Sequence, residues 1–233
     1  MKWKFILAVL FAVILVLGCS SSKTSETGNQ STETTTNTAT NNAASATNPG
    51  FSELMGMSPL TAYSITYDIT TNYGGETQGS TIKQAISGTK MKYDITTDNS
   101  PVRSVTILTD GKYYVCTLGM GQDMCFEMAT DSTQPTAADQ ASETAKEFEN
   151  TPDIVYDGTK TIAGATTYCY KTSSDGAEYK FCLHKDTGMI LGMYTTSSGT
   201  TTEMEATSFS TAAPSSSEFT LPAAVQQMPS YGG

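Results

Sequence analysis

The sequence has little of what metal, cofactor or nucleic-acid chemistry needs. It contains one histidine in 233 residues, and 23 acidic residues outnumber 13 basic ones, for a formal net charge of −10. Such a charge argues against nucleic-acid binding, because the phosphate backbone is itself negative. No cysteines have the C-x-x-C spacing of a zinc site, and no P-loop or dinucleotide fingerprint occurs. We therefore expect no metal site and no cofactor.

The residues left for catalysis do not suggest an active site. His184 is the single histidine, and its polar strand neighbours favour a solvated surface position over a catalytic one. Asp186-Thr187-Gly188 has the letters of an aspartic protease motif, but it lacks apolar flanks and a second copy. A turn accounts for its Asp and Gly. We expect a protein that is not an enzyme.

The N-terminus carries an export signal. Lys2 and Lys4 precede an unbroken apolar run, residues 5–17, which is too short for a comfortable membrane span. Val16 to Cys19 then resembles the lipobox of exported lipoproteins, in which the cysteine is lipidated and becomes the first mature residue. We expect residues 1–18 to be a signal peptide and the protein to be lipid-anchored on the extracytoplasmic face of the cell membrane. An uncleaved N-terminal anchor is the alternative.

Composition divides the rest of the chain into three parts. Residues 19–50 are rich in Ser, Thr, Asn and Ala and hold no Val, Ile, Leu, Met or aromatic side chain, which predicts a disordered tether. Residues 51–222 are enough for one sizeable core and form the expected domain. Residues 223–233 are expected to be a flexible tail.

One pair of cysteines brackets a hairpin signal. Asp175-Gly176 is typical of a two-residue type I′ turn, and in that register Cys169 faces Cys182. The position is a non-hydrogen-bonded pair, where side chains approach closely enough for a disulfide. The same register places Lys171 opposite Lys180, an unfavourable pair for which the sequence offers only solvent screening.

A second predicted hairpin places two cysteines at the same type of strand-pair position. A loop at Met120-Gly121 places Cys116 opposite Cys125, again at a non-hydrogen-bonded pair. In both hairpins the other face pairs apolar residues, so we expect both disulfides on the outer, solvent-exposed face. Disulfides persist outside the cytoplasm, which agrees with export.

Alternating strand patterns fill most of the domain. In residues 62–71 Tyr63, Ile65, Tyr67 and Ile69 share one face and polar residues the other, which favours antiparallel sheet with one buried face. Two segments break the alternation: 135–152 is rich in helix formers, and 51–57 fits a short helix. The other strands are expected at residues 80–87, 90–96, 102–109, 112–118, 123–129, 159–163, 165–173, 178–184, 189–196 and 201–209.

Large, adaptable side chains gather at the predicted inward positions. Methionine is frequent on apolar binding surfaces because it fits irregular contacts. These residues either line a ligand pocket or fill a solid core, and the pattern alone does not decide between the two. The candidate ligand-binding residues are Tyr63, Tyr67, Met91, Tyr93, Tyr113, Met128 and Met193.

The order of these features resembles the LolA/LolB-like lipoprotein-carrier superfamily over residues 52–222. The resemblance rests on the lipidated start, the Ser/Thr-rich tether, the stretches SITYDIT, KMKYDI, DGKYYVC and AGATTYCY, and the closing EFTLP. It implies a mainly β (α+β) fold, an open antiparallel half-barrel with one or two helices over the concave face and an apolar cavity. The two hairpin disulfides and the lipid anchor depart from the soluble periplasmic carriers, and Arg103 aligns with no family residue.

The expected function is therefore binding rather than catalysis. The resemblance implies a membrane-anchored lipoprotein that binds or carries a lipid, an acyl chain or another amphiphile in the half-barrel. The alternative is a structural or protein-interaction lipoprotein of the cell surface, with the same fold and a filled core. A membrane and an amphiphile are the expected partners, and the sequence indicates no particular protein partner.

Overall fold

A computed structural model describes residues 49–128, 154–174 and 176–226, all of which belong to the unit Ser45–Gly233. The predictions for the signal peptide, for Cys19 and for the helix at 135–152 lie outside the described residues. So do those for residues 19–48 of the tether and 227–233 of the tail.

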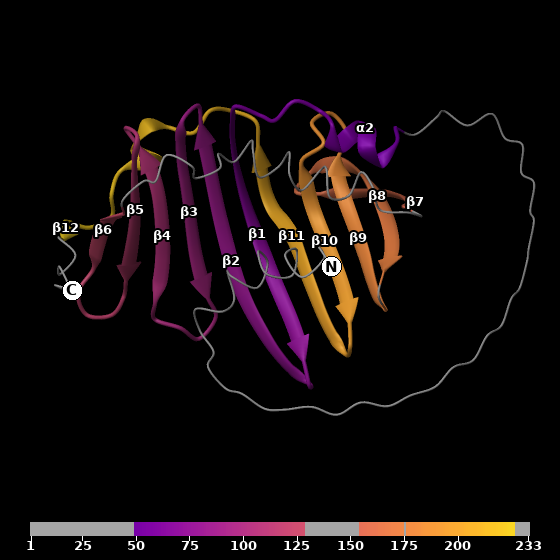
Figure 1. Ribbon diagram of the computed structural model, residues 1–233, viewed down its shortest axis with the longest axis horizontal. Helices are drawn as coiled ribbons and strands as arrows, with labels where there is room; N and C mark the ends of the chain where they lie inside the picture. Colours follow the sequence, from indigo (N-terminus) through magenta and orange to yellow (C-terminus); the bar gives the residue numbers. More distant parts are fainter. Residues whose placement is uncertain (1–48, 129–153, 175, 227–233) are drawn as a thin grey trace, which may run out of the picture. The chain divides into compact units, whose positions relative to one another are not determined.

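The described chain forms one open sheet of twelve strands (Figure 1). The strand order is β12-β6-β5-β4-β3-β2-β1-β11-β10-β9-β8-β7, and all neighbours are antiparallel except β12 and β6, which are parallel. This confirms the predicted mainly β, open half-barrel fold. The strands are β1 Ala62–Tyr73, β2 Glu76–Ser87, β3 Lys90–Thr97, β4 Arg103–Thr109, β5 Lys112–Leu118, β6 Met124–Met128, β7 Val155–Ile162, β8 Ala165–Ser174, β9 Ala177–His184, β10 Ile190–Ser197, β11 Thr200–Ser210 and β12 Val225–Gln226.

Both predicted hairpin registers are present. Cys169 pairs with Cys182 in β8–β9, and Cys116 pairs with Cys125 in β5–β6. The second turn is wider than the predicted Met120-Gly121 loop, because β5 ends at Leu118 and β6 begins at Met124. Within that turn the Gly119 amide donates a hydrogen bond of 2.8 Å to the Asp123 side chain, which takes the place of further strand pairing.

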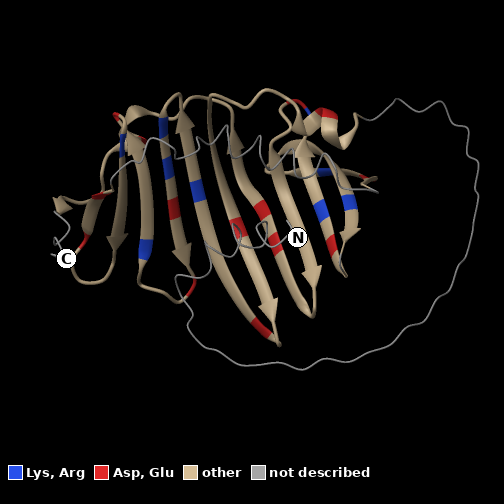
Figure 2. Ribbon diagram, in the orientation of Figure 1, with Lys and Arg blue, Asp and Glu red and all other residues tan. Residues whose placement is uncertain are grey.

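The pairing of β1–β6 gives the sheet two chemically different faces. We call the face that carries Tyr63 the tyrosine face; within these six strands its one charged residue is Glu76, at the turn end of β2. The opposite face, here called the charged face, carries many of the charges that mark the strands in Figure 2. Its charged residues in β1–β6 are Asp68, Lys83, Lys90, Lys92, Asp94, Arg103, Lys112 and Glu127.

The predicted short helix is α2, Phe51–Met55, which packs at the β8–β9 end of the sheet. The Phe51 ring contacts Tyr170 edge-on, with ring centroids 5.4 Å apart. Gly188 allows this close approach, because a Cβ atom there would lie 1.9 Å from the Leu54 carbonyl oxygen. In the described residues no helix has both the length and the apolar character needed to cross a bilayer.

The prediction that both disulfides lie on a solvent-exposed face is wrong. Cys116 and Cys125 are on the charged face, as their register requires, yet both are fully buried. The reason is the C-terminal segment, whose Leu221 and Ala223 pack on the Cys116–Cys125 cluster. The alternation of side chains along the strands predicts the correct face for the disulfides, but it does not predict which segment covers that face.

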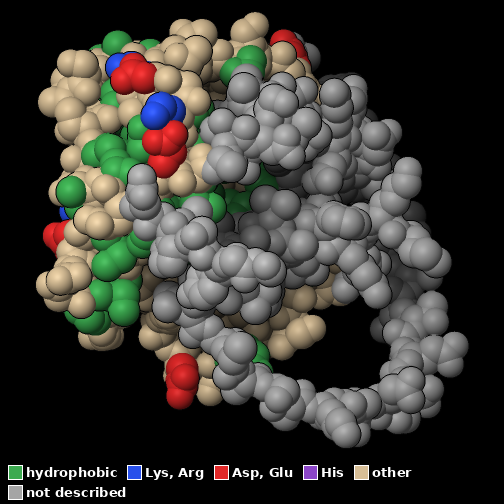
Figure 3. Space-filling view, turned by 60° about the vertical axis from the view of Figure 1, so that its left-hand side comes forward, with side chains coloured by type: hydrophobic (Ala, Val, Ile, Leu, Met, Phe, Trp, Pro, Cys, Tyr) green, Lys and Arg blue, Asp and Glu red, His purple; other side chains and the backbone are tan. Residues whose placement is uncertain are grey.

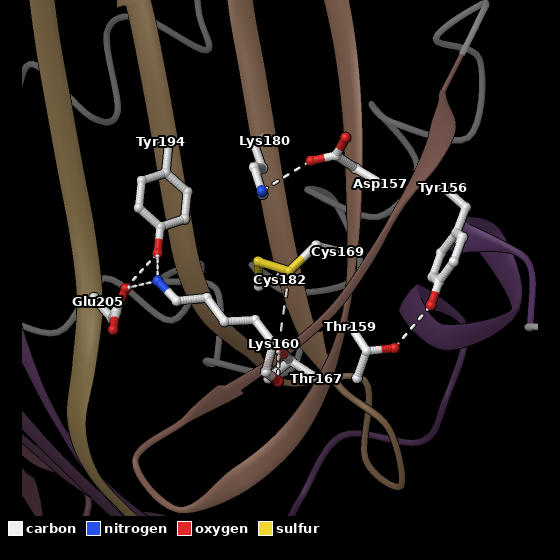
Figure 4. Close-up of a disulfide and its surroundings, with 10 residues drawn as sticks. All are labelled: Tyr156, Asp157, Thr159, Lys160, Thr167, Cys169, Lys180, Cys182, Tyr194 and Glu205. Atoms are coloured by element: carbon white, nitrogen blue, oxygen red, sulfur yellow. Dashed lines mark hydrogen bonds and ion pairs between the residues drawn. A yellow bond between two sulfur atoms is a disulfide. The ribbon is translucent and has the colours of Figure 1, made fainter.

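The Cys169–Cys182 disulfide is buried by a curl of the sheet (Figure 4). In a flat sheet, four strand spacings would place β7 about 19 Å from β11. Instead Lys160 on β7 donates to Glu205 on β11 at 2.5 Å and to Tyr194 on β10 at 2.7 Å. Burial is the largest single influence on the pKa of Lys160 and lowers it, but the hydrogen bonds and the electrostatic attraction of Glu205 and Tyr194 together raise the pKa by more, so the ammonium group is retained.

The curl also explains the pair of facing lysines. Asp157 on β7 lies 2.9 Å from the Lys171 ammonium and 2.8 Å from that of Lys180, so one carboxylate bridges the two lysines and reduces their repulsion. These hydrogen bonds, from Lys180 first and then Lys171, lower the pKa of Asp157. A bulge between Tyr156 and Gly158 interrupts the register at this position.

Candidate ligand-binding face

All seven predicted ligand-binding residues lie on the tyrosine face. Those of β1–β6 follow from the strand registers, and Met193 joins them through its pairing with Met204, which faces Ile69. Tyr63, Tyr67 and Tyr93 lie near one another on β1 and β3, whereas Met128 and Met193 lie farther out, on β6 and β10. The face thus combines phenol hydroxyls with apolar side chains.

Gln84 organises two of the tyrosines. It is on β2, paired with Tyr93 on β3 and two residues from Ile86, the partner of Tyr63. The Gln84 amide donates one hydrogen bond to the Tyr63 hydroxyl and one to the Tyr93 hydroxyl, each 2.8 Å long. Three side chains from three adjacent strands therefore form one polar cluster in apolar surroundings.

Tyr67 belongs to the same group but has a different role. Its hydroxyl donates a hydrogen bond of 2.6 Å to the Ile190 carbonyl, which ties β1 to β10 across β11. Its side chain is buried, and so is that of Tyr63. Tyr67 is therefore an anchor of the sheet, with its proton already engaged.

Burial sets the ionisation of these phenols. It raises the pKa of Tyr63, with a smaller contribution from Tyr93, and it raises that of Tyr67 further. The pKa of Tyr93 is also raised, by burial and then by Tyr113, while the hydrogen bond from Gln84 opposes the shift. All three remain neutral hydrogen-bonding groups at physiological pH.

The remaining predicted ligand-binding residues differ in burial and in the clusters against which they pack. Met91 packs half-buried against the cluster that contains Tyr63 and Ile86. Met193 packs against the cluster that contains Phe181. Tyr113 is half-buried, and its strand partner Met128 is exposed.

Apolar surface reaches solvent in several places. On the side turned forward in Figure 3, hydrophobic side chains form patches with few charged side chains between them. Exposed surface of this kind is a common feature of binding sites when it is contiguous. The large exposed hydrophobic residues are Tyr73, Met120, Met128, Val155, Tyr156 and Val225.

Gln84 is the residue that sequence reasoning missed. It was part of the predicted strand 80–87, but its amide was given no role. The signal was present, because a glutamine between Ile82 and Ile86 occupies an inward position in the alternation. A polar group placed among apolar neighbours needs hydrogen-bond partners, and tyrosines on the adjacent strands can supply them.

The charged face carries a separate cavity. Its volume is about 270 Å³, and the segment Pro214–Glu218 forms one wall. The Lys92 ammonium lies 3.6 Å from the Glu218 carboxylate at this wall. Arg103, the single arginine, binds buried Asp94 through both carboxylate oxygens, which raises the pKa of Arg103. These charges are matched within the chain, so Arg103 has a structural partner.

The described ranges contain no candidate metal site. Within them no three His, Cys, Asp or Glu side chains are grouped so as to hold a metal ion. His184 is half-buried, hydrogen-bonded to Thr187 at 2.9 Å and in contact with the Phe209 ring. Burial lowers its pKa, so the imidazole is mainly neutral at pH 7. Asp186 is ion-paired with Lys185 in the turn.

Comparisons with known proteins give likeness in structure alone. No family model matches the chain. No curated protein matches its sequence.

Several solved structures are similar to this chain. The structure of a MucA/MucB complex from Pseudomonas aeruginosa has a TM-score of 0.47 and 17% identity, and covers 73% of this chain and 58% of that one. LprF from Mycobacterium bovis has a TM-score of 0.45 and 12% identity, and covers 75% and 97%. A LolA superfamily protein from Nitrosomonas europaea has a TM-score of 0.31 and 10% identity, and covers 70% and 91%.

The chain spans just under three fifths of the chain that it matches in that complex, 58% of its length. One of these similar structures is a LolA superfamily protein, the superfamily that the sequence resembles. What the tyrosine face binds has to be argued from this chain's own residues.

Proposed function

We propose that the protein is a membrane-anchored extracytoplasmic lipoprotein that binds an acyl chain or another amphiphile on its tyrosine face. The observation that carries the proposal is the absence of charge on that face across β1–β6, apart from Glu76 at its rim. In a chain with 36 charged residues, such a segregation is unusual for a surface that meets only water. The face suits a ligand that is mostly hydrocarbon.

The polar groups on this face fit the same proposal. Ligand sites for apolar molecules are lined by hydrophobic and aromatic side chains, with a few placed polar groups that fix orientation. Such groups come from Tyr63, Gln84 and Tyr93. Met91 and Ile95 flank Tyr93 along the same face of β3. A binding role needs no catalytic residue, in agreement with the surroundings of His184 and Asp186.

Native mass spectrometry of protein purified from its own membrane tests the proposal. We expect a co-purifying lipid or amphiphile that is released by denaturation. A preparation that carries no amphiphile and binds no apolar fluorescent probe contradicts it. The second candidate, a structural or interaction lipoprotein with a filled core, predicts that result, and the burial of Tyr63 and Tyr67 is the observation in its favour.

The anchor is tested separately. Cys19→Ala removes the lipidated thiol, so we expect the protein to leave the membrane fraction while its domain stays folded. A variant that remains membrane-bound after a carbonate wash contradicts lipidation and supports an uncleaved anchor.

A further inference from the structure

In the Tyr63–Gln84–Tyr93 cluster, two phenol O–H groups have no hydrogen-bond acceptor among the described residues. A glutamine amide has two N–H groups, and Gln84 directs both at the tyrosines, one to each phenol oxygen. Each phenol oxygen is therefore an acceptor in this cluster. The O–H of each phenol has no acceptor among the described residues. Both phenol oxygens lie 2.8 Å from the Gln84 amide nitrogen, so the two O–H donors are close together.

Tyr67 shows that this is not a general property of the face. Its proton is donated to the Ile190 carbonyl, so the fold itself satisfies that phenol. Tyr63 and Tyr93 differ because Gln84 approaches them as a donor and leaves their protons unpaired within the described chain. A buried donor is costly without an acceptor, and water or a ligand must provide one.

The surroundings decide which acceptor fits. The tyrosine face of β1–β6 offers no lysine or arginine, so an anionic group placed there has no counter-ion. A carboxylate taken from water to such a place loses much of its solvation, whereas an uncharged carbonyl loses little. Burial, by raising the pKa of Tyr63 and Tyr93, also keeps both phenols in their donating form.

We infer that Tyr63 and Tyr93 are a donor pair, positioned by Gln84, that recognises the uncharged ester carbonyl of an acyl chain. The inference rests on the proposed function and sharpens it: the ligand is an esterified lipid, and a free fatty acid binds more weakly. One carbonyl oxygen has two lone pairs and can accept from both phenols.

The test uses full-length protein and an apolar fluorescent probe, N-phenyl-1-naphthylamine, displaced by three ligands of equal chain length. Methyl decanoate presents an ester, decanoate a carboxylate, and decane no acceptor. We expect the ester to displace the probe at a concentration about tenfold lower than decane does, the effect of two net hydrogen bonds, and lower than decanoate at neutral pH. Tyr63→Phe with Tyr93→Phe should abolish the ester's advantage over decane.

Tyr114→Phe is the matched control, because Tyr114 is a buried tyrosine on the charged face. It should keep the ester preference. If the double variant does not fold, Tyr93→Phe alone removes one donor and should reduce the preference by about threefold. An ester preference that survives in the folded variants, or tighter binding of decanoate, overturns the inference. If the probe does not bind the parent protein at all, the proposed function fails first.

Discussion

The two faces of the sheet differ in how their apolar residues are covered and in how their polar groups are paired. On the charged face the chain covers its own apolar clusters: Leu221 and Ala223 pack over one disulfide, and β7 curls over the other. Its charges are largely paired within the chain, as Asp94 is with Arg103. On the tyrosine face of β1–β6, Glu76 at the rim is the one charged residue, and two phenol protons lack an acceptor in the described residues. The difference supports the proposal that, within β1–β6, the tyrosine face is the one available to a ligand.

The largest effect is expected from uncovering the charged face. Phe219 lies in the short 3-10 helix Ser216–Phe219 and is buried. Phe219→Ala should cost about 3–5 kcal/mol of unfolding free energy, as truncation of a buried aromatic does. Urea unfolding measures it, with Val225→Ala, at an exposed position of the same segment, as the control. A cost below about 1 kcal/mol would show that the segment does not hold this face.

Removing the disulfides should have the next largest effect. The bridges close loops with sequence separations of 9 and 13, so each should contribute about 2–3 kcal/mol on the chain-entropy model. Paired Cys→Ala variants of each bridge, followed by urea unfolding, measure this. Peptide mapping without reductant should show Cys116 linked to Cys125 and Cys169 to Cys182. A peptide joining the two hairpins would contradict both registers.

The smallest effect is expected at Asp157. Asp157→Asn leaves Lys171 facing Lys180, but these side chains are partly exposed and solvent screens them, so the cost should be at most about 1 kcal/mol. Because the folded-state pKa of Asp157 is lowered, its contribution is present at neutral pH and is lost as the pH falls through about 4 and below. Urea unfolding at pH 7 and pH 3 should show a smaller difference between parent and variant at pH 3 than at pH 7. An equal difference at both values would contradict the ion-pair origin.

Local pattern was enough to predict the strands. Alternation places residues on faces and turn residues set register, so the pairing of Cys169 with Cys182 followed from Asp175 and Gly176. Neither signal contains information about distant segments. The covering of Cys116 by Leu221, more than a hundred positions away, is a tertiary contact that alternation does not encode.

The candidate site was predictable in composition but not in its hydrogen bonding. Tyr63, Tyr67 and Tyr93 were placed on one face because side chains alternate along strands. Which phenol donates, and to what, depends on interstrand register and on the curvature that brings Ile190 to Tyr67. Asp157 was missed for the same reason, since only the curl of β7 brings it between the two lysines.

The most direct test of the central claim places a charge on each face in turn. Thr106 is half-buried on the tyrosine face, opposite Tyr93, and Thr66 is half-buried on the charged face, opposite Lys83. Titration of full-length protein with N-phenyl-1-naphthylamine should show binding abolished by Thr106→Glu and unchanged by Thr66→Glu, with both variants folded by circular dichroism. Equal binding by the two variants, or a loss confined to Thr66→Glu, would contradict the assignment of ligand binding to the tyrosine face.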